Sequence, residues 1–160
     1  MSLQNPMTNI TPTLPSNPTT TAATKTVDQM LDSPMNIAFE QESLEMGLAA
    51  IATEFNDSVL KSQSSLRMSI NGTAFQKEGI TQNQQVRNFV QKGVPLRTVL
   101  TDLVRRANPV TTVQSPTEKD QKVVWIVLDD PENSGGKKIE LTTRTWATDN
   151  KVTLPKEFGN

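Results

Sequence analysis

Apolar residues recur at helical spacing in residues 43–55. From Leu44 they fall at i, i+3, i+4, i+7, i+8 and i+11, and Ser43 stands where an N-cap residue would accept a hydrogen bond. This spacing places the apolar side chains on one face of a helix. The segment is therefore predicted to be an amphipathic helix that packs on a core.

The stretch "VPLRTVLTDLVRRANP", residues 94–109, has a second stripe of this kind. Pro95 stands in the first turn, where its missing N–H costs nothing, and Asn108 and Pro109 end the pattern. The stripe consists of Leu96, Val99, Leu100, Leu103 and Val104. The stretch is predicted to be a helix that closes a core with its apolar face and leaves its outer face available for docking.

Five other segments have the patterns of β-strands. "MNIAFE" (35–40) and "LRMSI" (66–70) alternate apolar with polar residues, and "QVRNFVQ" (85–91) does so more weakly. "VVWIVL" (123–128) is continuously apolar, as expected for a strand covered on both faces. "KIELTTRTWA" (138–147) completes a hairpin with it. The predicted order is strand, helix, strand, strand, helix, strand, strand.

These elements predict an α+β fold, a small open mixed sheet of four to five strands with two helices packed on one face. The domain is predicted over residues 35–150, with residues 151–160 as a C-terminal extension. Residues 1–34 hold five of the ten prolines and bury too little apolar surface to offset the entropy of ordering them. They are predicted to be a disordered tether, with one helical turn at "VDQML" (27–31).

The two predicted helices also match each other. A shift of 52 residues superimposes Leu44, Leu48 and Ile51 on Leu96, Leu100 and Leu103. An internal duplication would explain this match, but so would the shared requirements of any two core helices.

The composition argues against several kinds of chemistry. The chain has no Cys, His or Tyr, which removes thiol nucleophiles, disulfides, imidazole bases and most zinc or haem ligands. A formal net charge of −1 creates no field that attracts nucleic acid, and no apolar run approaches the roughly eighteen residues of a membrane span. We therefore expect a protein that is not an enzyme, uses no cofactor, binds no nucleic acid and has no membrane insertion within this sequence.

Two polar motifs favour structural interpretations. "DDPENSGG" (129–136) offers oxygen atoms to calcium, but it misses the register of a calcium loop and lacks the closing glutamate. "GGKK" (135–138) lacks the earlier glycine and the hydroxyl of a phosphate-binding loop. Both are predicted to belong to a solvated hairpin turn, and no metal site is predicted.

Charge is distributed unevenly along the chain. Residues 36–60 contain five acids and no base, whereas residues 61–160 contain fifteen bases and ten acids. This pattern is typical of a two-signed docking surface, or of two solvated helix faces. The candidate partner-binding residues are Arg97, Arg105 and Arg106 on the second helix, with Lys137, Lys138, Arg144 and Trp146 on the closing hairpin.

Each half of this candidate surface has a structural alternative. The arginines suit the negative end of their helix, and Asp102 can pair with two of them. Trp146 is expected on the exposed face of its strand, where it would be a contact residue. The hairpin charges could instead prevent unwanted pairing at the free edge of the sheet.

The text "VRNFVQKGVPLRTVLTDLVRRAN" (86–108) resembles the short N-terminal domains of secretins and TonB-dependent receptors, and "MNIAFEQESLEMGLAAIATEF" (35–55) looks like a second copy of the same element. The resemblance covers roughly residues 35–128. Its anchors are Leu44, Leu48, Leu96, Leu100 and Leu103. A fainter similarity is to envelope proteins of planctomycete-type bacteria. The insert "SSLRMSINGTAFQKEGITQNQQ" (64–85) and the final hairpin depart from the family pattern.

The resemblance implies a non-catalytic protein-docking or assembly module in the periplasm or cell envelope, although the sequence shows no secretion signal. The partner would be another protein or a second copy of this chain. The alternative is a ligand-binding accessory domain of a larger envelope receptor or transporter component. A concave pocket with convergent polar groups would favour the alternative, and an open sheet edge would favour docking.

Overall fold

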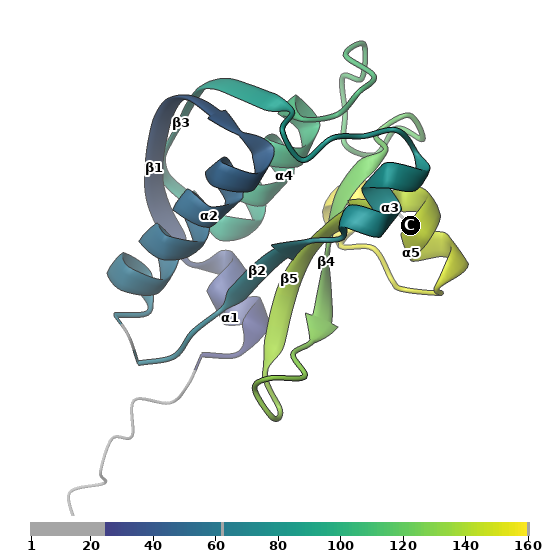
Figure 1. The fold of residues 1–160 in the computed structure, drawn as a ribbon. Helices are drawn as coiled ribbons and strands as arrows, with labels where there is room; N and C mark the ends of the chain where they lie inside the picture. Colours follow the sequence, from purple (N-terminus) through teal and green to yellow (C-terminus); the bar gives the residue numbers. More distant parts are fainter. Residues whose placement is uncertain (1–24, 62, 160) are drawn as a thin grey trace, which may run out of the picture.

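The computed structural model describes residues 25–61 and 63–159, and these form an α+β fold (Figure 1). The predicted fold class is confirmed. The helices are α1 (Val27–Asp32), α2 (Leu44–Glu54), α3 (Gly72–Lys77), α4 (Leu96–Arg106) and α5 (Arg144–Asp149), with a π-helical turn η1 (Phe55–Val59) and a 3-10 turn η2 (Lys156–Phe158). The strands are β1 (Pro34–Ser43), β2 (Arg67–Ile70), β3 (Gln85–Pro95), β4 (Val123–Asp129) and β5 (Lys137–Thr143). The prediction of a disordered tether falls largely on residues 1–24, which lie outside the described residues.

The five strands form two sheets rather than the one expected. β1 and β3 make an antiparallel pair, and the other sheet has the order β2-β5-β4, with β2 parallel and β4 antiparallel to β5. Helices α2 and α4 lie between the sheets, because α2 contacts β1 and β2 while α4 contacts β3 and β4 (Figure 1). Each central helix therefore buries side chains toward both sheets.

A glycine permits close packing of α2 against the two-stranded sheet. A Cβ atom on Gly47 would lie 3.1 Å from the Cζ atom of Phe39, which is tighter than an ordinary contact. The Phe39 ring also stacks on Phe89 of β3, with ring centroids 5.0 Å apart. The small residue thus lets the helix backbone approach an aromatic pair on the inner face of this sheet.

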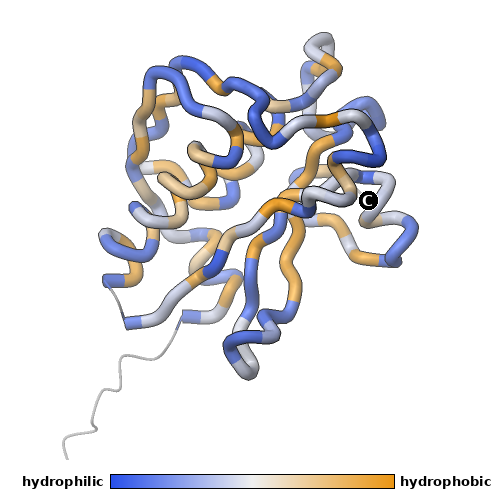
Figure 2. The backbone as a smooth tube through the Cα atoms, in the orientation of Figure 1, coloured by the Kyte–Doolittle hydropathy of each residue, from blue (hydrophilic) through white to orange (hydrophobic). Residues whose placement is uncertain are grey.

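The three-stranded sheet is covered on both faces, as the continuous apolar run predicted. α4 packs on one face, and α3 and α5 lie against the other. Val123, Val124, Trp125 and Ile126 of β4 are all fully buried. Figure 2 shows the apolar strands of this sheet running through the middle of the molecule.

The predicted match between the two helical segments has a structural counterpart. α2 begins directly after β1 and α4 directly after β3, and 52 residues separate the starts of the two helices as well as their ends. β1 and β3 run antiparallel, with Pro34 opposite Pro95. The molecule thus contains two similar strand–helix units, and their origin by duplication stays a prediction.

The described fold extends past both predicted domain limits. The predicted helical turn is confirmed as α1, which starts with a capping box between Thr26 and Gln29. Met30 and Leu31 of α1 are buried, and so is Phe158 at the other end of the chain. Segments assigned to a tether and an extension therefore contribute side chains to the core.

Candidate functional site

The outer face of α4 holds its basic side chains in local contacts. Asp102 pairs with Arg105 and Arg106, at 2.9 Å in each case, as the spacing predicted. Arg106 also donates to the carbonyl oxygen of Asn88, at 3.1 Å, and lies 5.2 Å from the ring centroid of Phe89. Arg106 therefore already takes part in joining α4 to β3, whereas Arg105 is paired within α4.

The hairpin lysines are also in ion pairs. Lys137 pairs with Asp129 on the opposite strand, and the Nζ atom of Lys138 lies 3.4 Å from Glu140 Oε1. The turn is polar as predicted, and the buried carboxylate of Asp130 accepts from Arg67 at 2.6 Å. The lysines therefore lie next to the hairpin turn as paired charges.

Arg144 and Trp146, the last two candidate residues, lie on α5 rather than on a strand. The prediction of an exposed strand position for Trp146 is therefore wrong. β5 ends at Thr143, whose side chain accepts from the N–H of Trp146 and caps α5. Trp146 is half-buried against the core. The N-cap hydrogen bond competes with continued strand structure, which explains the error.

Arg144 ties loops together. Its guanidinium donates to the carbonyl oxygens of Gln121 (3.1 Å), Pro116 (3.0 Å), Glu118 (3.3 Å) and Phe158 (3.3 Å). Burial lowers the pKa of Arg144, because a low-dielectric environment disfavours the charged form. The side chain therefore fastens the loop of residues 116–121 and the C-terminal Phe158 to the start of α5.

Of the predicted residues, Lys137 and Arg144 each line a cavity. Arg97 lines a third one. It stands at the start of α4 and donates from Nε to Asp32 Oδ1 at 2.7 Å and from Nη1 to Glu157 Oε1 at 3.0 Å. Burial disfavours its charge, but the hydrogen bonds and charges of Glu157 and Asp32 outweigh this effect and raise the pKa of Arg97. Arg97 thus joins α1, α4 and η2 as a fixed cation.

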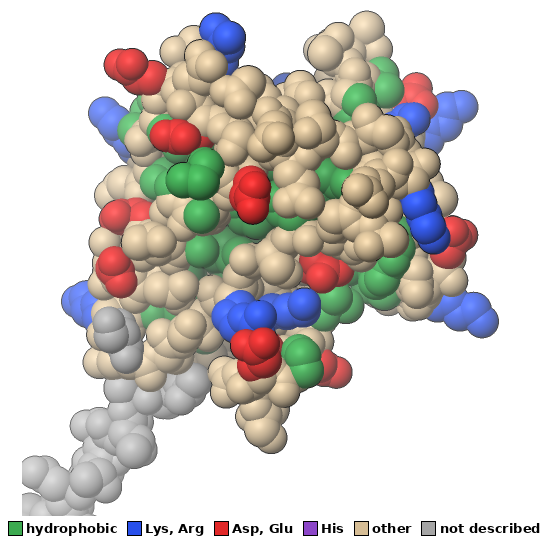
Figure 3. Space-filling model, viewed as in Figure 1, with side chains coloured by type: hydrophobic (Ala, Val, Ile, Leu, Met, Phe, Trp, Pro, Cys, Tyr) green, Lys and Arg blue, Asp and Glu red, His purple; other side chains and the backbone are tan. Residues whose placement is uncertain are grey.

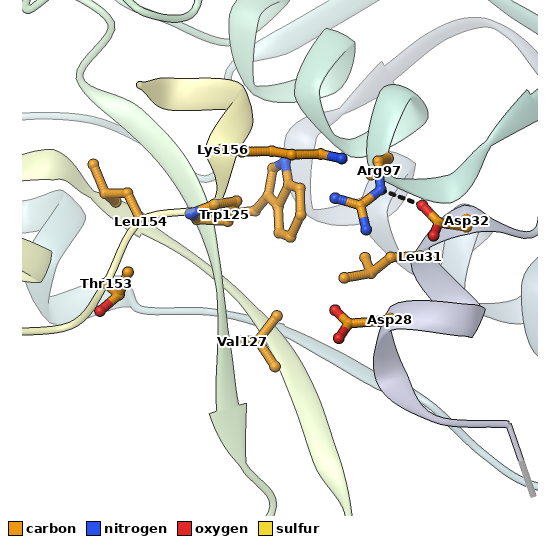
Figure 4. Close-up of a pocket in the computed structure, with 10 residues that line it drawn as sticks. Asp28, Leu31, Asp32, Arg97, Trp125, Val127, Thr153, Leu154 and Lys156 are labelled. Carbon is orange, nitrogen blue, oxygen red and sulfur yellow. Dashed lines mark hydrogen bonds and ion pairs between the residues drawn. The ribbon is translucent and has the colours of Figure 1, made fainter. Parts of the chain in front are cut away.

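The cavity has a volume of about 420 Å³ and opens between α1 and the C-terminal segment (Figure 4). Such a volume lies in the range of small-ligand sites. Its lining consists of Asp28, Leu31, Asp32, Arg97, Trp125, Val127, Thr153, Leu154, Pro155 and Lys156. Figure 4 shows Trp125 and Val127 of β4 on one side of the hollow and α1 on the other.

β4 is an edge strand, and its register shows which backbone groups face outward. Asp130 donates its N–H to Gly136, and Arg144 donates to Lys122, so the even-numbered residues of β4 pair with β5. The odd-numbered residues consequently direct their N–H and C=O groups away from β5. Within the described residues, β5 is the sole strand that pairs with β4.

Side chains occupy one end of this outward edge. The N–H of Val123 donates to Asn108 Oδ1 at 3.2 Å, and its carbonyl accepts from Gln121 Nε2 at 2.7 Å. Next along the strand, Phe158 packs edge-to-face on Trp125, with centroids 6.1 Å apart. The first half of the edge is therefore hydrogen-bonded at Val123 and fully buried at Trp125.

The second half of the edge is open. Val127 is half-buried, Asp129 is exposed, and within residues 25–61 and 63–159 their outward N–H and C=O groups have no hydrogen-bond partner. Val127 also lines the cavity. We call this open half of the edge, together with the cavity beside it, the edge groove.

Sequence reasoning missed most of the edge groove. Lys156 lies in the predicted extension, and Asp28 lies in the predicted tether. Leu31 is the last residue of the predicted helical turn, and it lines the cavity. The strongest available signal was Thr26 with Gln29 three residues later, a capping box that marks the start of an ordered helix.

The acidic segment of the sequence lies beside basic residues of β3, such as Arg87, so a two-signed docking surface stays a prediction. The acidic residues 40, 42, 45, 54 and 57 fall on β1, α2 and η1, and Figure 3 shows acidic side chains scattered over this part of the molecule. Among the described residues, no cluster of three or more acidic side chains could hold a metal ion. Across the same residues, no helix has the length and apolar character needed to cross a membrane.

Together these features define an α+β domain with a half-open sheet edge beside a charged cavity. No family model matches this chain, and no curated protein or solved structure matches it significantly.

Proposed function

We propose that this protein is a non-catalytic docking module that accepts an extended segment of a partner protein at the edge groove. One observation carries the proposal: the outward N–H and C=O groups of Val127 and Asp129 stand open beside the cavity. An added strand would satisfy these groups, and its side chains would enter the cavity. The main chain would fix the register of the partner strand, and side chains in the cavity would supply both affinity and specificity.

The contrast between the two halves of the edge supports this function. Natural proteins protect exposed strand edges with charges, loops or irregular structure. In the first half of the β4 edge, the backbone groups of Val123 bond to Asn108 and Gln121, and Phe158 packs next to them. The second half lies beside the cavity. A partner strand is the occupant that such a selectively open edge fits.

The proposed setting is the bacterial periplasm or cell envelope. Its support is the resemblance of residues 35–128 to secretin and TonB-receptor N-terminal domains, together with the absence of Cys. Fractionation of the native cells with an antibody against the chain would test the compartment. Recovery in the cytosolic fraction would contradict it.

The docking role is tested by removing one outward N–H. Val127→Pro deletes a donor of the open edge without touching the ladder to β5. Gln41→Pro is a matched control on the other sheet. The N–H of Leu44 donates to Gln84, so the even-numbered residues of β1 form the hydrogen bonds to β3. The N–H of Gln41 therefore faces outward, as that of Val127 does on β4.

The assay is sedimentation velocity of the full chain for self-association, together with affinity capture from the native envelope extract. Docking at the edge groove predicts that Val127→Pro loses the complex while Gln41→Pro keeps it, with both variants folded by circular dichroism. Equal retention by both variants would contradict docking at β4.

The second candidate function is ligand binding, and the cavity itself favours it. The hollow combines the apolar side chains of Leu31, Trp125 and Val127 with the charges of Arg97 and Lys156. A ligand-binding domain would bind a small amphiphilic anion more tightly than any extended peptide, and Gln41→Pro would leave this affinity unchanged. A docking module would bind the extended peptide more tightly.

A further inference from the structure

The charged residues of the cavity lie on different sides of its apolar surface. Figure 4 shows Lys156 extending across Trp125 toward the guanidinium of Arg97, whereas Asp28 lies on the α1 side near Val127. An incoming strand at Val127 would therefore pass between the unpaired Lys156, beside the Arg97–Asp32 pair, and the carboxylate of Asp28. The cavity thus distinguishes partner segments by charge.

The basic groups have unused capacity for hydrogen bonds. Arg97 donates from Nε and Nη1 to Asp32 and Glu157, and in the described part of the chain its Nη2 has no partner. The exposed Lys156 forms no ion pair within that part either. Because Asp32 and Glu157 already compensate the charge of Arg97, Lys156 supplies the uncompensated positive charge, and Arg97 adds a hydrogen-bond donor that is held in place.

We infer that the edge groove recognises an extended peptide segment that presents a carboxylate to Lys156 and Arg97 and an apolar side chain to Leu31 and Val127. This inference rests on the proposed docking function and adds the chemistry of the partner. The carboxylate comes from a Glu or Asp side chain or from a free C-terminus. Such a group gains a charge-assisted hydrogen bond that a neutral or basic segment cannot form.

The experiment is an NMR titration of the ¹⁵N-labelled full chain with three synthetic heptapeptides, at up to about 2 mM to detect weak binding. In the first peptide, alternating Thr and Val flank a central Glu and both ends are blocked. The second has Lys in place of this Glu. The third has no charged side chain but a free C-terminal carboxylate.

We expect the Glu peptide or the C-terminal peptide to shift the amide resonances of Val127 and Asp129 with a Kd about tenfold below that of the Lys peptide. Whichever of the two binds identifies the source of the carboxylate. Lys156→Glu should abolish this preference. Lys92→Glu, an equal charge change on exposed β3, should leave it intact.

The outcomes separate this inference from the docking function on which it rests. Equal affinity for the Glu, Lys and C-terminal peptides would overturn the carboxylate inference and leave docking at the edge in place. No shift at Val127 with any peptide would overturn both. A preference for carboxylate that survives Lys156→Glu would also overturn the inference, because the anion would then bind elsewhere.

Discussion

Replacing Asn108 by alanine should destabilise the fold by at least about 3 kcal/mol, although the residue is uncharged and stands just after a helix. Its buried amide forms four hydrogen bonds to the backbone. Nδ2 donates to the carbonyl oxygens of Val110 (3.0 Å) and Asp120 (2.9 Å), and Oδ1 accepts from the N–H groups of Lys122 (2.7 Å) and Val123 (3.2 Å). One side chain thus fixes the loop between α4 and β4.

The magnitude follows from what each backbone group would lose. Val110 is half-buried and Asp120 is exposed, so water replaces the lost donors at about 0.5 to 1.5 kcal/mol each. Val123 is fully buried and Lys122 is half-buried. An orphaned buried N–H costs about 1 to 3 kcal/mol, so these two donors supply the larger share of the loss.

The assay is urea unfolding followed by intrinsic fluorescence, because Trp125 is buried and Trp146 half-buried. The control is Asn150→Ala, since the exposed Asn150 side chain forms one hydrogen bond, to the carbonyl oxygen of Trp146. The control should lose less than about 1 kcal/mol. If Asn108→Ala also lost less than that, the proposed role of the amide would be refuted.

Three further predictions concern stability. Leu100→Ala should cost about 2 to 5 kcal/mol, because Leu100 is fully buried, whereas Arg105→Ala should cost less than about 1 kcal/mol; similar urea midpoints for the two variants would contradict this. Phe158→Ala should cost about 3 to 5 kcal/mol and shift Trp125 emission to longer wavelength, because the edge-to-face partner is lost; an unchanged spectrum would contradict the contact. Thr26→Ala should cost about 1 kcal/mol and speed hydrogen exchange of the α1 amides, and unchanged exchange would argue against the capping box.

The central helices could be predicted from sequence because their signals are local. Periodicity over eleven residues identifies the buried face, and Ser43 and Pro95 mark the starts within one residue. Leu44 and Leu96, the first residues of the two helices, are both fully buried. Local caps and a continuous stripe were therefore sufficient for these elements.

The division into two sheets could not be predicted in the same way. Alternation shows which face of a strand is buried but does not show which strand lies beside it. β1 pairs with β3 although α2 and β2 lie between them in the chain. β2 pairs with β5 although β3, α4 and β4 lie between them. Such pairings depend on long-range packing, for which the segments carry no individual signal.

The candidate site was predicted only in part. Arg97 was selected for its exposed helical position, yet its partners Asp32 and Glu157 lie about sixty residues away in each direction. Which backbone groups of β4 face outward depends on its register with β5. The C-terminal segment that packs beside this edge through Phe158 has no strong hydrophobic pattern in its sequence. Trp146 was misplaced because the capping role of Thr143 was not recognised.

The size of the open edge constrains how docking can work. Val127 and Asp129 offer at most two donors and two acceptors to an added strand, because the intervening Leu128 pairs with β5. At about 0.5 to 1.5 kcal/mol net for each bond, the ladder would yield roughly 2 to 6 kcal/mol. Association alone costs an estimated 4 to 15 kcal/mol in lost translational and rotational freedom. The main chain of the partner is therefore insufficient by itself, and side chains that fill the cavity beside Val127 must supply the remaining free energy.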